Sequence, residues 1–155
     1  MFTVKVAFTR EKDPDFVSKR IMDFLDTDYS HCFFINDGFI YHATGDGVNR
    51  CHLDVYLEDH VIVHERMLPL PLMTEDSFKA YMRGADAKEY GHLQYAGFIA
   101  PWAQKLVRNG NAKQICSELI AEIARDYGNL KLPKEQDFMS PKDVLILLSD
   151  KTNLD

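Results

Sequence analysis

One cysteine and two histidines have the chemistry and the setting of a catalytic thiol site. Cys116 lies in a segment, residues 114–124, in which apolar residues recur at helical spacing, and the turn signal Asn109-Gly110 places the cysteine in about the first turn of the helix. The unpaired N–H groups and the dipole at a helix N-terminus favour an anion, so a thiol there loses its proton more easily. Cys116 is therefore a candidate nucleophile. The plainer interpretation is a small core residue beside isoleucine.

A thiolate nucleophile works with a base that accepts and returns a proton, and a third polar group usually orients that base. His31 opens an expected strand and His42 lies on the next one, with the tight-turn signal Asn36-Asp37-Gly38 between them. Hairpin pairing would bring both histidines onto neighbouring positions of one face. With the cysteine helix packed on that face, Cys116, His31 and His42 would act as nucleophile, base and orienting residue. Taken singly, each histidine also fits an ordinary strand position.

The other expected elements must hold these residues in place. Alternating or β-branched apolar runs predict strands, and helical periodicity after capping signals predicts helices. The expected strands are residues 2–8, 29–35, 39–43, 48–53 and either 55–57 or 60–67. The expected helices are residues 16–25, 77–84, 90–102, the Cys116 segment and 144–148, with Phe16 and Phe24 in the apolar stripe of the first and Gly128 as a C-cap. This order predicts one α+β domain over residues 1–155, a small antiparallel sheet flanked by helices.

Composition narrows the class of protein. The chain has 155 residues, 46% of them hydrophobic and 27% charged, as in ordinary globular domains. A net charge of −6 and a pI near 5.5 argue against a nucleic-acid partner. We find no signal-peptide pattern and no apolar run long enough for a membrane span, and the three scattered cysteines fit a reducing compartment. We therefore expect a cytoplasmic protein.

A metal site competes with the thiol site. His60 and His64, with Cys51 and His52, could supply nitrogen and sulfur ligands. The residues between the two histidines, Val61-Ile62-Val63, are β-branched and predict a strand. On a strand His60 and His64 would share a face but lie about 13 Å apart, too far to hold one ion. We therefore expect neither a metal nor another cofactor. Cys32 should point to the face opposite His31.

Five short motifs in this order resemble the circularly permuted NlpC/P60 proteins of the papain-like superfamily, the YiiX/YaeF-like group and the related lecithin:retinol acyltransferase-like group. The motifs are Tyr29-Ser30-His31, Ile40-Tyr41-His42-Ala43, Gly45-Asp46-Gly47-Val48, Cys116-Ser117-Glu118-Leu119 and Ser140-Pro141-Lys142-Asp143. The resemblance covers about residues 16–148. It implies Cys116 as nucleophile and His31 as general base. It also implies His42 as third polar residue, as in the acyltransferase-like members, where YiiX-like members more often have an acidic residue.

The resemblance implies a thiol hydrolase that cleaves an amide bond, of a peptide or a cell-wall peptide, through an acyl-enzyme on Cys116. The backbone N–H of Cys116 would meet the oxyanion, with the Tyr29 hydroxyl as a further candidate. A lipid ester or amide is the main substrate variant, with hydrolysis or acyl transfer on the same residues. A binding or virion module that retains the fold is the non-enzymatic alternative, and a small phage or bacterial protein would fit either.

Overall fold

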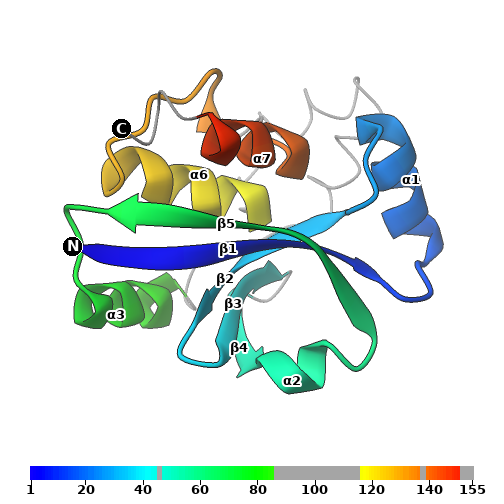
Figure 1. The fold of residues 1–155 in the computed structure, drawn as a ribbon, viewed down its shortest axis with the longest axis horizontal. Helices are drawn as coiled ribbons and strands as arrows, with labels where there is room; N and C mark the ends of the chain where they lie inside the picture. The colour runs from blue at the N-terminus through cyan, green and yellow to red at the C-terminus, as the bar shows by residue number, and fades with distance from the viewer. Residues whose placement is uncertain (45–46, 86–115, 137–138, 151–155) are drawn as a thin grey trace.

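Five antiparallel strands form one open sheet in the order β4-β3-β2-β1-β5, in a computed structural model that describes residues 1–44, 47–85, 116–136 and 139–150 (Figure 1). The strands are β1 (Phe2–Glu11), β2 (His31–Asn36), β3 (Phe39–Thr44), β4 (Gly47–His52) and β5 (His60–Leu70). The helices are α1 (Phe16–Leu25), α2 (Leu53–Tyr56), α3 (Glu75–Ala85), α6 (Cys116–Asp126) and α7 (Pro141–Ser149). The predicted α+β class with an antiparallel sheet is confirmed.

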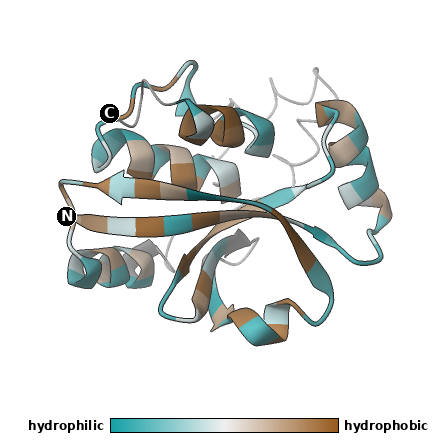
Figure 2. Ribbon diagram, in the orientation of Figure 1, coloured by the Kyte–Doolittle hydropathy of each residue, from teal (hydrophilic) through white to brown (hydrophobic). Residues whose placement is uncertain are grey.

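The sheet is buried on both faces. Each strand places alternate residues on opposite sides, so each face has its own set of core residues. One face, here called the helix face, carries Cys32, Phe34 and Tyr41 and belongs to the large core that includes residues of α3, α6 and α7. The other, here called the Tyr56 face, carries Phe33 and Ile40 and packs against Tyr56 of α2 in a smaller core. Figure 2 shows hydrophobic residues along β1 and β5 and on α6 and α7.

The β1 strand contributes residues to both cores, and it pairs with β2 on one side and with β5 on the other. Val4, Val6 and Phe8 are buried in the large core, and Ala7 is buried in the small one. The expected alternation of residues 2–8 is thus observed, and apolar residues also occupy the second face. A strand buried on both sides needs such residues on both.

The β2–β3 hairpin forms as the Asp-Gly signal predicts. Asn36 pairs with Phe39, and the two turn residues between them, Asp37 and Gly38, have φ angles of 55° and 77°. Positive φ at both central residues is the geometry that follows the twist of the adjoining strands.

Two helix starts also agree with the sequence. The Asp15 carboxylate accepts a hydrogen bond from the N–H of Ser18 at 2.8 Å and caps α1, whose bounds match the prediction. Ser140 and Asp143 form a reciprocal capping box at α7, with Pro141 as its first residue. Both caps satisfy N–H groups that have no partner inside the helix.

Several local predictions are wrong. In α1 the predicted apolar stripe is split, since Phe16 and Phe24 are 72% and 47% exposed and the buried residues are Ile21 and Leu25, one turn apart. Residues 55–57 are not a strand, because α2 occupies residues 53–56, and the alternative strand at residues 60–67 is the observed one.

The C-terminal end of α6 differs from the predicted glycine cap. Asn129, with φ of 57°, takes the left-handed conformation. Gly128 is needed for a different reason: a Cβ there would lie 2.7 Å from the carbonyl oxygen of Ala124. The chain therefore uses its glycine for close packing and its asparagine for the left-handed turn. The expected helix at 90–102 and the turn at Asn109-Gly110 lie outside the described residues.

The hairpin turn provides a test of the fold. Gly38→Ala should lower the free energy of unfolding by about 1 kcal/mol, because a Cβ is strained at positive φ even though no atom lies within 4 Å of it. Asp37→Asn, which keeps a residue that tolerates this conformation, is the control and should change little. Urea unfolding of both variants measures the difference, and an unchanged midpoint for Gly38→Ala would contradict the turn geometry.

Candidate active site

Cys116 is the first residue of α6 and is 1% exposed. The helix that follows is buried along most of its length, and its apolar side chains pack in the large core against residues of β2 and β3. This packing holds the start of α6 beside the start of β2. A thiol at this position lies near the positive end of the helix dipole, which favours its ionised form.

A second thiol lies beside the Cys116 sulfur. Cys32 of β2 donates its S–H to the Cys116 sulfur, with the two sulfurs 3.9 Å apart and both residues buried. Burial, and then the hydrogen bond and charge of Cys116, raise the pKa of Cys32 well above its ordinary value. Cys32 therefore stays protonated and acts as a hydrogen-bond donor toward a Cys116 thiolate.

His31 is the first residue of β2 and pairs with Thr9 of β1. Burial of its imidazole lowers the pKa. The charge of Cys116, a side-chain hydrogen bond with Cys116 and the charge of Glu11 raise it, and together they place the pKa of His31 above 6.5. The protonated imidazole is thus favoured when the neighbouring thiol is ionised. This is the electrostatic pattern of a thiolate–imidazolium pair.

The route by which the cysteine meets the histidine differs from the prediction. The α6 helix packs on the helix face, with Cys32, whereas the ring of His31 lies 5.9 Å from that of Phe33, which belongs to the Tyr56 face. Cys116 and His31 meet where the start of α6 lies beside the start of β2. The expectation that the cysteine helix covers the histidine face is therefore wrong, and the expected opposite orientation of Cys32 is confirmed.

His42 of β3 lies next to His31, with ring centroids 5.7 Å apart and planes at 73°. Burial, followed by the positive charge of His31, lowers the pKa of His42 to about 4, although the charge of Cys116 acts in the opposite direction. His42 is therefore neutral near pH 7, whereas the pKa of His31 is shifted in the opposite direction, upward. Two adjacent imidazoles with opposite pKa shifts have separate roles.

Tyr56 is a component of this site that the sequence analysis missed. Its ring lies 6.1 Å from that of His42 and stacks at 3.8 Å on the ring of His60. Its buried hydroxyl shares a 3.0 Å hydrogen bond with Thr9, the strand partner of His31. Tyr56 lies in a short apolar segment for which the sequence offered a strand as one alternative, and nothing in that pattern marked it as part of a site. Its ring packs between those of His42 and His60.

Tyr29, the candidate oxyanion donor, is buried in the large core, two residues before His31. Its ring packs against Phe8 and His64 at centroid distances of 5.5 and 5.6 Å. Burial, then the charges of Cys32 and Asp28, raise the pKa of Tyr29 to about 12. These contacts describe a core tyrosine, in the same core as Cys116. The structure brings together Cys116, His31 and His42, and the role of Tyr29 as an oxyanion donor stays a prediction.

His60 and His64 do not share a face, contrary to the prediction. The β1–β5 register shifts between Phe8 and Thr9, so that Phe8 pairs with His64 but Thr9 pairs with Ile62. This bulge turns His64 toward Tyr29 and leaves His60 stacked on Tyr56. Within the described part of the chain, no group of three or more histidine, cysteine or acidic side chains is arranged to hold a metal ion.

Comparison with known proteins adds no relative. No family model matches the chain, and no curated protein matches it. None of the helices in the described ranges combines the length and the apolar character needed to cross a bilayer.

The neutral His42 predicts a pH dependence of stability. In the unfolded chain this histidine takes a proton near pH 6.5, but in the folded chain only near pH 4. As the pH falls below 6.5 the unfolded state binds the proton first, so His42 should remove on the order of 2 kcal/mol of stability by pH 4.5. The pKa of His31 is raised in the folded state, so protonation of His31 stabilises the fold as the pH falls. The contributions of His31 and His42 to stability must therefore be separated.

The separation is made by comparing wild type with His42→Gln in urea unfolding at pH 7 and pH 4.5. The variant should lose less stability on acidification than the wild type, because it lacks the group that the folded state keeps neutral. Equal losses in the two proteins would mean that His42 is not protonated later in the folded state.

The Cys32 thiol predicts a shift in the reactivity of Cys116. Cys32→Ala removes an S–H donor from the Cys116 sulfur, so the pH midpoint of Cys116 alkylation should rise by about half a unit. The matched control is Cys51→Ala, at a partly buried thiol of β4 on the Tyr56 side of the sheet. Alkylation followed by peptide mass gives each midpoint, and identical midpoints in the two variants would exclude the proposed donor.

Proposed function

We propose that this protein is a thiol hydrolase with a circularly permuted, NlpC/P60-like arrangement of the papain-like site, which cleaves an amide bond through an acyl-enzyme on Cys116. The substrate class is a peptide or cell-wall peptide. The observation that carries the proposal is the hydrogen-bonded pair of Cys116 and His31, in which the thiol raises the pKa of the imidazole.

The arrangement of elements supports the same proposal. The histidine-bearing hairpin precedes the cysteine-bearing helix in the chain, the reverse of an unpermuted papain-like order. The start of α6 lies against β2, and the Ser140-Pro141 segment caps a helix of the same core. Each of these features corresponds to a motif on which the resemblance rests.

The chemistry follows from the pair. The Cys116 thiolate attacks the amide carbon, and the backbone N–H of Cys116 lies at the helix start to meet the oxyanion. Protonated His31 gives its proton to the leaving amine as the C–N bond breaks, which leaves an acyl-enzyme. Neutral His31 then takes a proton from water, the resulting hydroxide attacks the thioester, and the Cys116 thiolate leaves.

His42 is a positioning residue for His31 in this proposal. It is neutral near pH 7, its ring lies edge to face with that of His31, and Tyr56 packs behind it. A carboxylate at this position would balance the positive charge of His31, but a neutral imidazole does not. In this site that charge is balanced by Cys116 and Glu11. This third residue matches the acyltransferase-like relatives, so a lipid ester or amide is the variant substrate, with water or a second acceptor releasing the acyl group.

A non-catalytic binding module is the second candidate, and one observation favours it. Cys116 is 1% exposed, so a substrate reaches the sulfur only after the groups that cover it have moved. An inert, buried thiol would be the remnant of a site kept for its fold. The two candidates differ in the reactivity of one sulfur atom.

We place the protein in the reducing cytoplasm. Cys32 and Cys116 are free thiols whose sulfurs are 3.9 Å apart, and an oxidising compartment would couple neighbouring thiols and remove the nucleophile.

The first test is the rate of alkylation by iodoacetamide against pH, read at each cysteine by peptide mass. Cys116 should react with a midpoint well below the ordinary thiol value of about 8.5, because His31 and the helix start stabilise its thiolate. His31→Ala should abolish that low midpoint. Cys51 in the same molecule is the internal control, since burial raises its pKa. A Cys116 that reacts slowly and independently of His31 would favour the binding module.

The second test is turnover of a panel of amide and ester substrates. Cys116→Ala and His31→Ala should each lower kcat/KM by about 10⁴-fold or more, whereas His42→Ala should cost about 10²-fold, since it acts through His31. Urea unfolding of each variant shows whether the fold is kept. Loss of the fold in both Cys116→Ala and Cys116→Ser would instead assign the cysteine to the core.

A further inference from the structure

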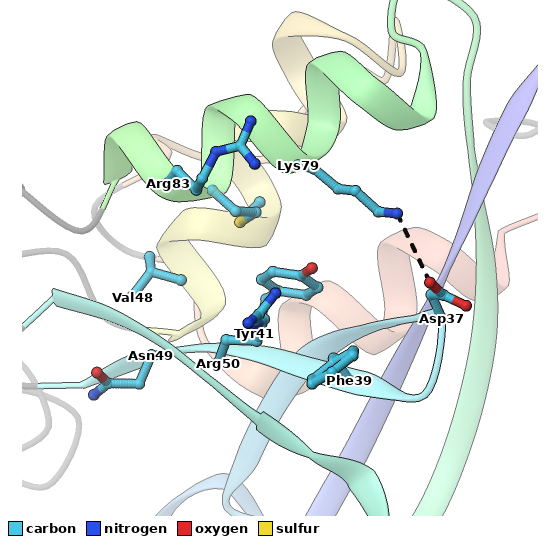
Figure 3. A pocket seen from close by; sticks show the side chains of 9 residues that line it. Asp37, Phe39, Tyr41, Val48, Asn49, Arg50, Lys79 and Arg83 are labelled. Atoms are coloured by element: carbon cyan, nitrogen blue, oxygen red, sulfur yellow. Dashed lines mark ion pairs between the residues drawn. The ribbon is translucent and has the colours of Figure 1, made fainter.

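A pocket that Cys116 does not line lies on the helix face, between α3 and the β3–β4 pair. Its volume is about 410 Å³, within the range of small-ligand pockets. Figure 3 shows side chains entering it from α3 on one side and from β3 and β4 on the other. The lining residues used below are Phe39, Tyr41, Arg50, Lys79, Met82 and Arg83.

The pocket is positively charged although the chain as a whole carries −6. Of its three cations, Lys79 is already balanced by Glu75 at 3.0 Å and Asp37 at 3.8 Å. The other two are Arg50 and Arg83, and neither forms an ion pair with a carboxylate of the described residues. Two guanidinium groups thus remain to attract an anion of charge −2.

The two arginines come from different elements and are held in different ways. The Arg50 guanidinium lies 4.5 Å from the centre of the Phe39 ring, a cation–π contact that limits its motion. Arg83 follows Lys79 by four residues on α3, so both project from one side of the helix. A guanidinium presents paired N–H donors that match the oxygens of a phosphate.

The rest of the lining is mixed, with the carboxylate of Asp37 and the amide of Asn49 beside aromatic and apolar side chains. Tyr41 and Met82 form the apolar part of the wall; they are 7% and 1% exposed, and both belong to the large core. An apolar wall beside two guanidinium groups suits a ligand that joins an anionic head to an aromatic or apolar body. Inorganic phosphate alone would leave this wall without a partner.

This pocket is separate from the candidate active site. Arg50 pairs with Tyr41 across β3 and β4, and both lie on the helix face, whereas His42 belongs to the Tyr56 face beside Tyr56. None of the residues Cys116, His31, His42 and Tyr56 lines it. A ligand here can therefore be tested with the thiol intact or removed.

We propose that this pocket binds a small phosphate monoester with an aromatic or apolar body, its phosphate held by Arg50 and Arg83 and its body against Tyr41 and Met82. A dianion matches the two guanidinium charges better than a carboxylate does. The site does not depend on catalysis by Cys116.

The test is titration calorimetry with phenyl phosphate in a phosphate-free buffer at constant ionic strength, with benzoate and inorganic phosphate as comparison ligands. Phenyl phosphate should bind at about millimolar concentration or below, and more tightly than either comparison ligand. Arg50→Gln and Arg83→Gln should each weaken its binding at least ten-fold. The matched control is Arg20→Gln, an exposed arginine over the Phe16 ring of α1, which loses the same charge and should bind as the wild type does.

Three results would overturn the proposal: no binding of phenyl phosphate at 10 mM or so, equal weakening in Arg20→Gln, or benzoate binding as tightly as phenyl phosphate. Arg83 is exposed on a helix, so Arg83→Gln keeps the test valid if Arg50→Gln fails to fold. Cys116→Ala should leave the affinity unchanged, so a failed hydrolase proposal and a failed phosphate proposal give different results.

Discussion

The burial of β2 on both faces is the constraint on which the rest of the structure depends. Cys32 and Phe34 point into the large core, while Phe33 points into the small one. A one-residue slip of this strand would exchange the two sets and place an imidazole among the helices. The pairing of β2 with β1, from Lys5 with Ile35 to Thr9 with His31, therefore decides both the packing and the position of the candidate base.

A consequence of this placement is that the titratable groups of the site shift one another's pKa values. Cys116 and Glu11 raise the pKa of His31, and the charge on His31 contributes to lowering that of His42. The two imidazoles do not both become charged near neutral pH, because the pKa of His42 is lowered to about 4. Cys32, with its raised pKa, remains a donor to the Cys116 sulfur. Burial and neighbouring charges thus shift the two imidazoles in opposite directions.

The sheet also separates the candidate active site from the arginine pocket. His31, His42 and Tyr56 occupy one face, while the arginine pocket opens on the other, beside α3. A chain of net charge −6 gathers in that pocket two guanidinium groups that form no ion pair with the carboxylates the structure describes, against the sign of its overall field. The local arrangement of charges, and not the total, determines what such a surface attracts.

Local physics made part of this structure predictable. The Asp37-Gly38 turn, the Asp15 cap and the Ser140 capping box are each determined by a few adjacent residues. For that reason the hairpin and the bounds of α1 could be derived from sequence. The exposure of Phe16 could not, because periodicity shows that a helix has an apolar side but not which neighbour will cover it.

The amino-acid sequence by itself determined the α+β class, the antiparallel hairpin and the choice of Cys116, His31 and His42 as chemically suited residues. Only the tertiary structure decided that α6 packs on the face opposite the histidines, that Cys32 touches Cys116 and that Tyr56 backs His42. The physical reason is the separation in sequence between the residues that make contact. Turns and caps are contacts within four residues, whereas the Cys32–Cys116 contact joins positions 84 apart and depends on the packing of the whole core.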